Sequence, residues 1–130
     1  MLEDDLKRYG IKTHPCHVLC ETKTGHAPRF VARHTHRHPL PARSLIILNK
    51  DTLIVTPELL FLELAASRDI DDIELLRIGF ELCGTYVLDV SEDSWDGYTS
   101  TYAPITSAKK ISTFLERCSG MNGSKRCLLY

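Results

Sequence analysis

The most informative hydrophobic pattern begins just after Thr56, where an apolar run is broken by few polar residues. Threonine is a favoured helix N-cap, and Pro57 takes the first helical position, where proline is preferred. Glu58 follows in the first turn, where a carboxylate interacts favourably with the helix dipole. These signals predict a helix over residues 57–67 that is apolar around most of its circumference and therefore deeply buried.

A second helix is predicted directly after the first. Asp71 is suited to cap it, and Glu74 stands three residues later, as in a capping box. Gly84 favours its termination. The predicted inward face recurs at helical spacing and consists of Ile73, Leu76, Phe80 and Cys83. Together the two segments predict a helical hairpin over residues 57–83.

Short apolar or alternating runs predict four to five β-strands, at residues 17–20, 29–38, 45–48, 53–56 and 86–90. The third and fourth runs flank residues 49–52, which include an asparagine and an aspartate, so a β-hairpin is expected there. Because both runs are almost continuously apolar, the hairpin is expected to lie centrally, covered by helices on at least one face.

Three other segments show helical spacing. Residues 1–10 predict a short N-terminal helix, and residues 107–118 predict a third major helix before Gly120. Residues 124–130 predict the start of a helix that the sequence does not complete. The polar residues 91–103 predict a surface loop.

These elements predict one α+β domain over residues 1–130. Its expected architecture is a mostly antiparallel sheet of four to five strands, packed against the helical hairpin and the third helix. Segregated helices covering one antiparallel sheet are a common layered way to bury both apolar surfaces.

The composition indicates where in the cell the protein is located. No apolar run approaches the roughly 20 residues that span a bilayer, and the acidic start differs from a signal peptide. Both observations predict a cytoplasmic location with no membrane partner. The odd set of cysteines has no disulfide-framework spacing and is expected to consist of small buried thiols: Cys16, Cys20, Cys83, Cys118 and Cys127.

The net charge of −1 conceals a segregation of charge along the chain. Residues 1–50 carry nine Lys/Arg and four Asp/Glu, residues 51–100 carry two and twelve, and residues 101–130 carry five and one. Two interpretations stay open. The opposite surfaces meet within the fold or face water, or they form a bipolar surface that steers a charged partner.

Alternating histidines are the sharpest chemical feature. His34, His36 and His38 would project from one face of the predicted strand 29–38, with neighbouring backbones about 7 Å apart. Two such imidazoles can share a metal ion, and a zinc-compatible set could be completed by His14, Cys16 or Cys20. The alternative is a half-exposed strand that binds no metal, and no other cofactor is indicated.

The opposite face of the same predicted strand is basic. Arg29, Arg33 and Arg37, with Arg43 nearby, could contact phosphates of a nucleic acid or another anion.

No complete catalytic constellation is recognisable. Cys16 and His17 are adjacent, so on a strand they would point to opposite faces and could not form an ion pair.

The order of several motifs resembles bacterial AbiEi-type antitoxins. The resemblance rests on residues 17–19, 33–34, 40–41, 53–59 and 62–65. Members of that family join a DNA-binding winged helix to an α/β domain and neutralise nucleotidyltransferase toxins. The resemblance implies a toxin as the partner protein.

A further resemblance is to uncharacterised actinobacterial proteins, carried by residues 79–86 and 123–126. In these proteins a domain similar to very-short-patch-repair endonucleases follows. The likeness extends over nearly all of residues 13–127, and it implies that the chain is the middle of a longer architecture. A winged helix would not fit before residue 13, and the nuclease-like domain would begin where the chain ends.

Two hypotheses about function follow. The first is a non-catalytic, antitoxin-like regulatory domain that binds a partner protein, either a toxin or a linked nuclease domain. The second is an accessory part of a nuclease-type defence protein, in which Arg29, Arg33, Arg37 and Arg43 grip DNA phosphates.

Overall fold

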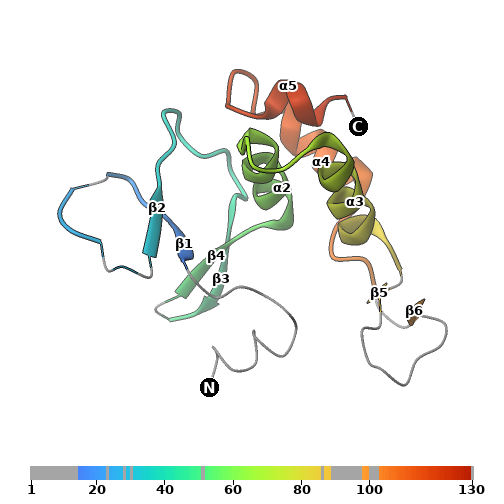
Figure 1. Cartoon of the computed structure of the whole chain (residues 1–130), viewed down its shortest axis with the longest axis horizontal. Coiled ribbons are helices and arrows are strands. Elements are labelled where there is room, and N and C mark those ends of the chain that lie inside the picture. The colour runs from blue at the N-terminus through green and yellow to red at the C-terminus, as the bar shows by residue number, and fades with distance from the viewer. Residues whose placement is uncertain are drawn as a thin grey trace. The chain divides into compact units, whose positions relative to one another are not determined.

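The computed structural model describes residues 15–22, 24–27, 29, 31–50, 52–85, 87–88, 98–99 and 103–129 (Figure 1). The chain divides into two compact units, Met1–Pro39 and Leu40–Tyr130. The predicted helix over residues 1–10 lies outside the described residues. Among the residues that are described, no helix is both long and apolar enough to cross a membrane.

The first unit contains a pair of parallel strands. β1 (Cys16–Leu19) pairs with β2 (Val31–His34), and the register ends where Leu19 stands opposite His34. The strand predicted over residues 29–38 is therefore shorter than expected. β2 has β1 as its partner, and its ladder ends where β1 ends, so His36 and His38 lie beyond the strand.

The second unit opens with the predicted hairpin, formed by β3 (Leu45–Asn49) and β4 (Thr52–Val55). Its central position is not confirmed, because five of its apolar side chains are exposed: Leu45, Ile46 and Ile47 on β3, and Leu53 and Ile54 on β4. The exposed fraction of Ile47 reaches 76%. A continuous apolar run was therefore an unreliable indicator of burial for this hairpin.

The helical hairpin has the predicted caps. In α2 (Pro57–Ala66), the Thr56 hydroxyl accepts a hydrogen bond from the backbone N–H of Leu59. In α3 (Asp72–Cys83), the Asp71 carboxylate accepts from the N–H of Glu74 at 2.8 Å. Each side chain satisfies a backbone donor that the first helical turn leaves without a partner.

Two C-terminal helices complete the second unit. α4 (Ala108–Glu116) begins at Ser107, whose hydroxyl accepts from the N–H of Lys110. α5 (Ser124–Cys127) is a single turn, and it follows Gly123 in the left-handed conformation. The predicted third helix is confirmed, whereas the last predicted helix ends after four residues.

The core of the second unit is helical and centred on α2, which packs against α3, α4 and α5 (Figure 1). This central position explains why α2 is apolar on nearly all sides. The buried apolar side chains are Leu59, Phe61, Leu62, Ala65, Leu75, Ile111, Phe114, Leu115, Cys118, Met121 and Cys127.

Arg126 ties α5 to the connection between α2 and α3. Its guanidinium donates to the carbonyl oxygens of Ala65, Ser67 and Ile70 at 3.2, 3.1 and 2.6 Å, and to the Asp72 carboxylate at 2.7 Å. The carbonyls at the end of α2 would otherwise lack intrahelical donors. One side chain on α5 therefore links the end of α2, the connecting segment and the start of α3.

The predicted sheet architecture is wrong. The described strands form separate two-stranded ladders, β1–β2, β3–β4 and the two-residue pair β5 (Val87–Leu88) with β6 (Tyr98–Thr99). The first ladder is parallel and the other two are antiparallel. The described residues thus contain no antiparallel sheet of four to five strands, because α2 is buried by other helices and does not need a sheet to cover it.

Candidate protein-docking groove

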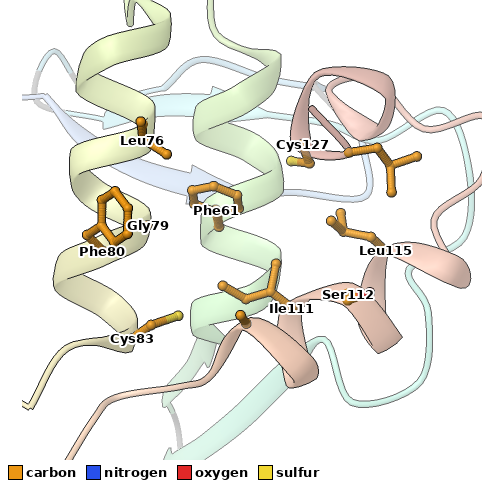
Figure 2. Close-up of a pocket in the computed structure, with 11 residues that line it drawn as sticks. Phe61, Leu76, Gly79, Phe80, Cys83, Ile111, Ser112, Leu115 and Cys127 are labelled. Atoms are coloured by element: carbon orange, nitrogen blue, oxygen red, sulfur yellow. The ribbon is translucent and has the colours of Figure 1, made fainter. Parts of the chain in front are cut away.

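An apolar groove with a cavity volume of about 410 Å³ lies among helices α2, α3, α4 and α5. α2 packs closely on α3 and on α4, but within the described residues α3 and α4 do not pack closely on each other. The groove is the space left between them. Figure 2 shows residues of α3 on one side, residues of α4 and α5 on the other, and Phe61 of α2 between them.

One wall of the groove comes from α3. Leu76, Phe80 and Cys83 stand at intervals of three and four residues and so share one helix face. Gly79 lies on this face, and a Cβ atom there would be 3.2 Å from Cε2 of Phe61. The glycine therefore lets α3 approach α2 closely enough for the Phe61 ring to form the floor.

The opposite wall comes from α4 and α5. Ile111 and Leu115, four residues apart on α4, are buried, and Leu128 follows α5. The floor and the α4 wall are therefore covered by the chain itself. The remaining surface is open, since the exposed fraction is 63% for Phe80 and 68% for Leu128.

The cysteine thiols that line the groove have raised pKa values and are therefore unreactive at neutral pH. Burial raises the pKa of Cys127 to about 11, with a smaller contribution from Cys118. Burial also raises the pKa of Cys83, and the nearby Glu58 carboxylate adds to that effect. Both side chains are neutral thiols at neutral pH. Because the thiolate is the nucleophilic form, these thiols are poor nucleophiles and behave as small apolar groups.

Basic side chains flank the walls. Arg77 on α3, Lys109 on α4 and Lys125 on α5 each stand within three positions of a lining residue, and all are exposed. Exposed acidic side chains meet the same criterion, namely Glu74 and Glu81 on α3 and Glu116 on α4. The groove is therefore apolar inside, and charged side chains of both signs surround it.

The predicted metal-binding histidines do not share one strand face. His34 ends β2, and its Nε2 lies 2.7 Å from Nδ1 of His17 on β1. The ring centroids are 4.9 Å apart and the ring planes differ by 17°. The distance between the centroids nearly equals the nitrogen–nitrogen distance plus the radius of each ring. The two rings therefore meet edge to edge, and an N–H of one ring donates a hydrogen bond to a nitrogen of the other.

The sequence pattern did not identify His17 as a partner of His34, because it gave no indication that β1 and β2 run parallel in this register. Within the described part of the chain, no group of three or more His, Cys, Asp or Glu side chains could hold a metal ion. Cys20 donates its backbone N–H to the carbonyl of His34. His14 and the side chain of Cys16 lie outside what the structure describes.

The predicted phosphate-binding arginines belong to different units. Arg29, Arg33 and Arg37 lie in the first unit, and Arg43 lies in the second with a backbone φ of 66°. Arg33 donates to the carbonyl oxygens of Thr24 and Gly25 at 2.7 and 2.6 Å. Its guanidinium stabilises the loop between β1 and β2, so part of its donor capacity is already used.

Comparisons with protein-family models, with curated proteins and with solved structures found no match for this chain. The resemblance to AbiEi-type antitoxins therefore stays a prediction. The groove is the feature of the described residues from which a function can be inferred.

Proposed function

We propose that this protein is an interaction module whose second unit binds an amphipathic helix of a partner protein in the groove between α3 and α4. The observation that carries the proposal is a groove with a covered floor and an open, apolar α3 wall. Exposed apolar surface gathered in one concavity, with polar groups around it, is typical of protein-binding sites.

We infer that the bound element is a helix, because the groove lies between α3 and α4, where a further helix could pack. α3 and α4 both pack on α2 but not closely on each other, so a further helix between them would contact the exposed side chains of Leu76 and Phe80. α3 contains twelve residues, which corresponds to about 18 Å of helix. Helix-binding grooves usually take side chains at positions i, i+3 or i+4, and i+7.

The α3 surface continues the stripe that such a helix would contact. Ile73, Leu76 and Phe80 recur at helical spacing, and all three are exposed. An apolar small molecule would use less of this surface. Small-molecule sites also commonly place several polar groups around the ligand, whereas Ser112 supplies the one hydroxyl among the lining residues.

The source of the helix is a separate question. A toxin or a linked nuclease domain, the partners implied by the antitoxin resemblance, is the first candidate. This keeps the non-catalytic, regulatory role as the proposed function, with the groove as its binding surface.

The test uses the full chain and two fluorescent helical peptides of about 16 residues with leucines at i, i+3, i+4 and i+7. One peptide carries glutamates beside the leucines, and the other carries lysines. We expect at least one to bind, as measured by fluorescence anisotropy. Phe80→Asp should weaken that binding by at least about tenfold, because the substitution places a charge where the bound helix would bury an aromatic side chain.

Ile47→Asp is the matched control, since Ile47 is at least as exposed as Phe80 but lies on β3. It should leave peptide binding unchanged. The proposal fails if neither peptide binds at millimolar concentration, or if both variants weaken binding equally. Concentration-dependent dimerisation that Phe80→Asp abolishes, without peptide binding, would assign the groove to a second copy of the chain.

A further inference from the structure

We infer that the chain forms a weak homodimer, in which one face of the β3–β4 hairpin packs on the same face of a second copy. This surface lies on elements that do not line the groove. The dimer contact is therefore independent of the proposed function and adds an interface between copies of the chain.

The hairpin is a small apolar sheet without a cover. Among the described residues, neither β3 nor β4 packs closely on a helix. Figure 1 shows the two strands extending away from α3, α4 and α5. Apolar surface gathered in one exposed patch is typical of protein contacts.

The pairing of the strands shows which face is the more exposed. Ile47 stands opposite Leu53, and strand alternation places Leu45 on the same face as Ile47. The exposed fraction is 76% for Ile47 and 59% for Leu53. Ile46 and Ile54 stand opposite each other on the other face, and their exposed fractions are lower, 43% and 41%. The interface is therefore assigned to the face of Ile47 and Leu53.

The composition of the strands favours a second copy as the partner. β3 and β4 contain no charged residue and no proline. Natural proteins use charges and prolines to keep apolar strands from associating with each other, and these strands have neither device. An uncharged face also offers no charge pattern that would select a different partner. Two identical flat faces can pack around a two-fold axis, as in stacked β-sheets.

The exposed area sets the expected strength of the dimer. The exposed parts of Leu45, Ile47 and Leu53 provide roughly 300 Å² of apolar surface per copy. Because somewhat more than half of a typical interface is apolar, this corresponds to about 500 Å² buried per copy. Stable complexes bury about 800 Å² per partner, and transient ones bury less. The dimer should therefore exchange with the monomer.

Sedimentation equilibrium of the full chain tests the inference. Between about 10 and 500 µM, the average mass should rise from that of one chain toward that of two. The rise should persist in about 500 mM sodium chloride, because the contact contains no ion pair for salt to screen. Ile47→Thr should weaken dimerisation by at least about tenfold, since the two-fold axis places each substitution in the interface twice.

Ile46→Thr is the matched control. It makes the same substitution at the neighbouring position, on the other face of β3, and threonine preserves strand propensity in both variants. Ile46→Thr should change the dissociation constant of the dimer by less than about twofold.

Three outcomes would overturn the inference. The first is a full chain that stays monomeric at about 500 µM; if Ile47→Thr also lowers its free energy of unfolding, another part of the same chain covers the face. The second is equal weakening by Ile46→Thr and Ile47→Thr. The third is dimerisation that Phe80→Asp abolishes and Ile47→Thr does not, which would place the contact in the groove. Dimerisation that responds as expected, with no helical peptide bound, would support the inference while the proposed function fails.

Discussion

Gly123 occupies the tightest backbone contact described for a glycine of this chain. Its φ is +85°, and a Cβ atom would lie 2.6 Å from the carbonyl oxygen of Leu62 and 2.7 Å from the nitrogen of Ala66. Gly123→Ala is expected to lower the free energy of unfolding by about 2–4 kcal/mol, because α5 would have to move away from α2. Urea denaturation followed by circular dichroism measures this loss.

Gly120 provides the control for conformational strain alone. Its φ is also +85°, but an added Cβ would meet nothing within 4 Å. Gly120→Ala should therefore lower the free energy of unfolding by about 1–2 kcal/mol, the cost of a left-handed residue with a side chain. Equal losses in the two variants would show that the contact with α2 is unimportant.

The raised pKa of the Cys127 thiol predicts that the free energy of unfolding depends on pH. Its pKa is raised to about 11 from an ordinary value of 9.0, so in alkaline solution the unfolded thiol ionises before the folded one. The free energy of unfolding should therefore fall as pH rises from about 9 through about 11.

Alkylation of Cys127 by iodoacetamide should be slower at pH 8 in the folded chain than in urea, and the difference should narrow toward pH 11. Peptide mass spectrometry resolves this site from the other cysteines. Equal rates at pH 8 would contradict the burial of the thiol.

At the scale of elements, one side chain joins three helices. Arg126→Lys keeps the charge but loses the planar fork that reaches the carbonyls of Ala65, Ser67 and Ile70. We expect the free energy of unfolding to fall by about 2 kcal/mol. Lys125→Ala, at the exposed neighbouring position, should change it by less than about 0.5 kcal/mol. A thermal or urea melt that cannot separate these two variants would contradict the role of Arg126.

The helices were predictable because their caps are local signals. Thr56, Asp71 and Ser107 precede helices α2, α3 and α4, and each makes its capping hydrogen bond within three residues. The strand pairing was not predictable in the same way. Which strands meet depends on contacts distant in sequence, and the apolar runs of β3 and β4 do not reveal whether anything covers them.

The groove was not predictable for a related reason. The sequence correctly indicated an apolar face on α3, and that face was expected to point inward. A periodic pattern shows that a face is apolar, but it does not show whether the same chain buries it. Ile73 and Phe80 are exposed because α4 packs on α2 and leaves their face of α3 uncovered.

At the scale of the whole molecule, the two units predict independent folding of the second. Its buried apolar core lies within residues 40–130. This fragment should therefore show a cooperative urea transition. It should also bind whichever helical peptide binds the full chain, with a dissociation constant within about twofold of that of the full chain. A fragment without a cooperative transition would show that the first unit is required for the core.

The central place of α2 also has a consequence during protein synthesis. α2 is synthesised before α4 and α5, and the residues of these helices that cover it are made about 40 to 70 residues later. At about 5–20 residues per second, the nascent chain would expose this apolar helix for seconds. Such a segment is a natural target for chaperones that bind nascent chains, until Cys127 has emerged and the core can close.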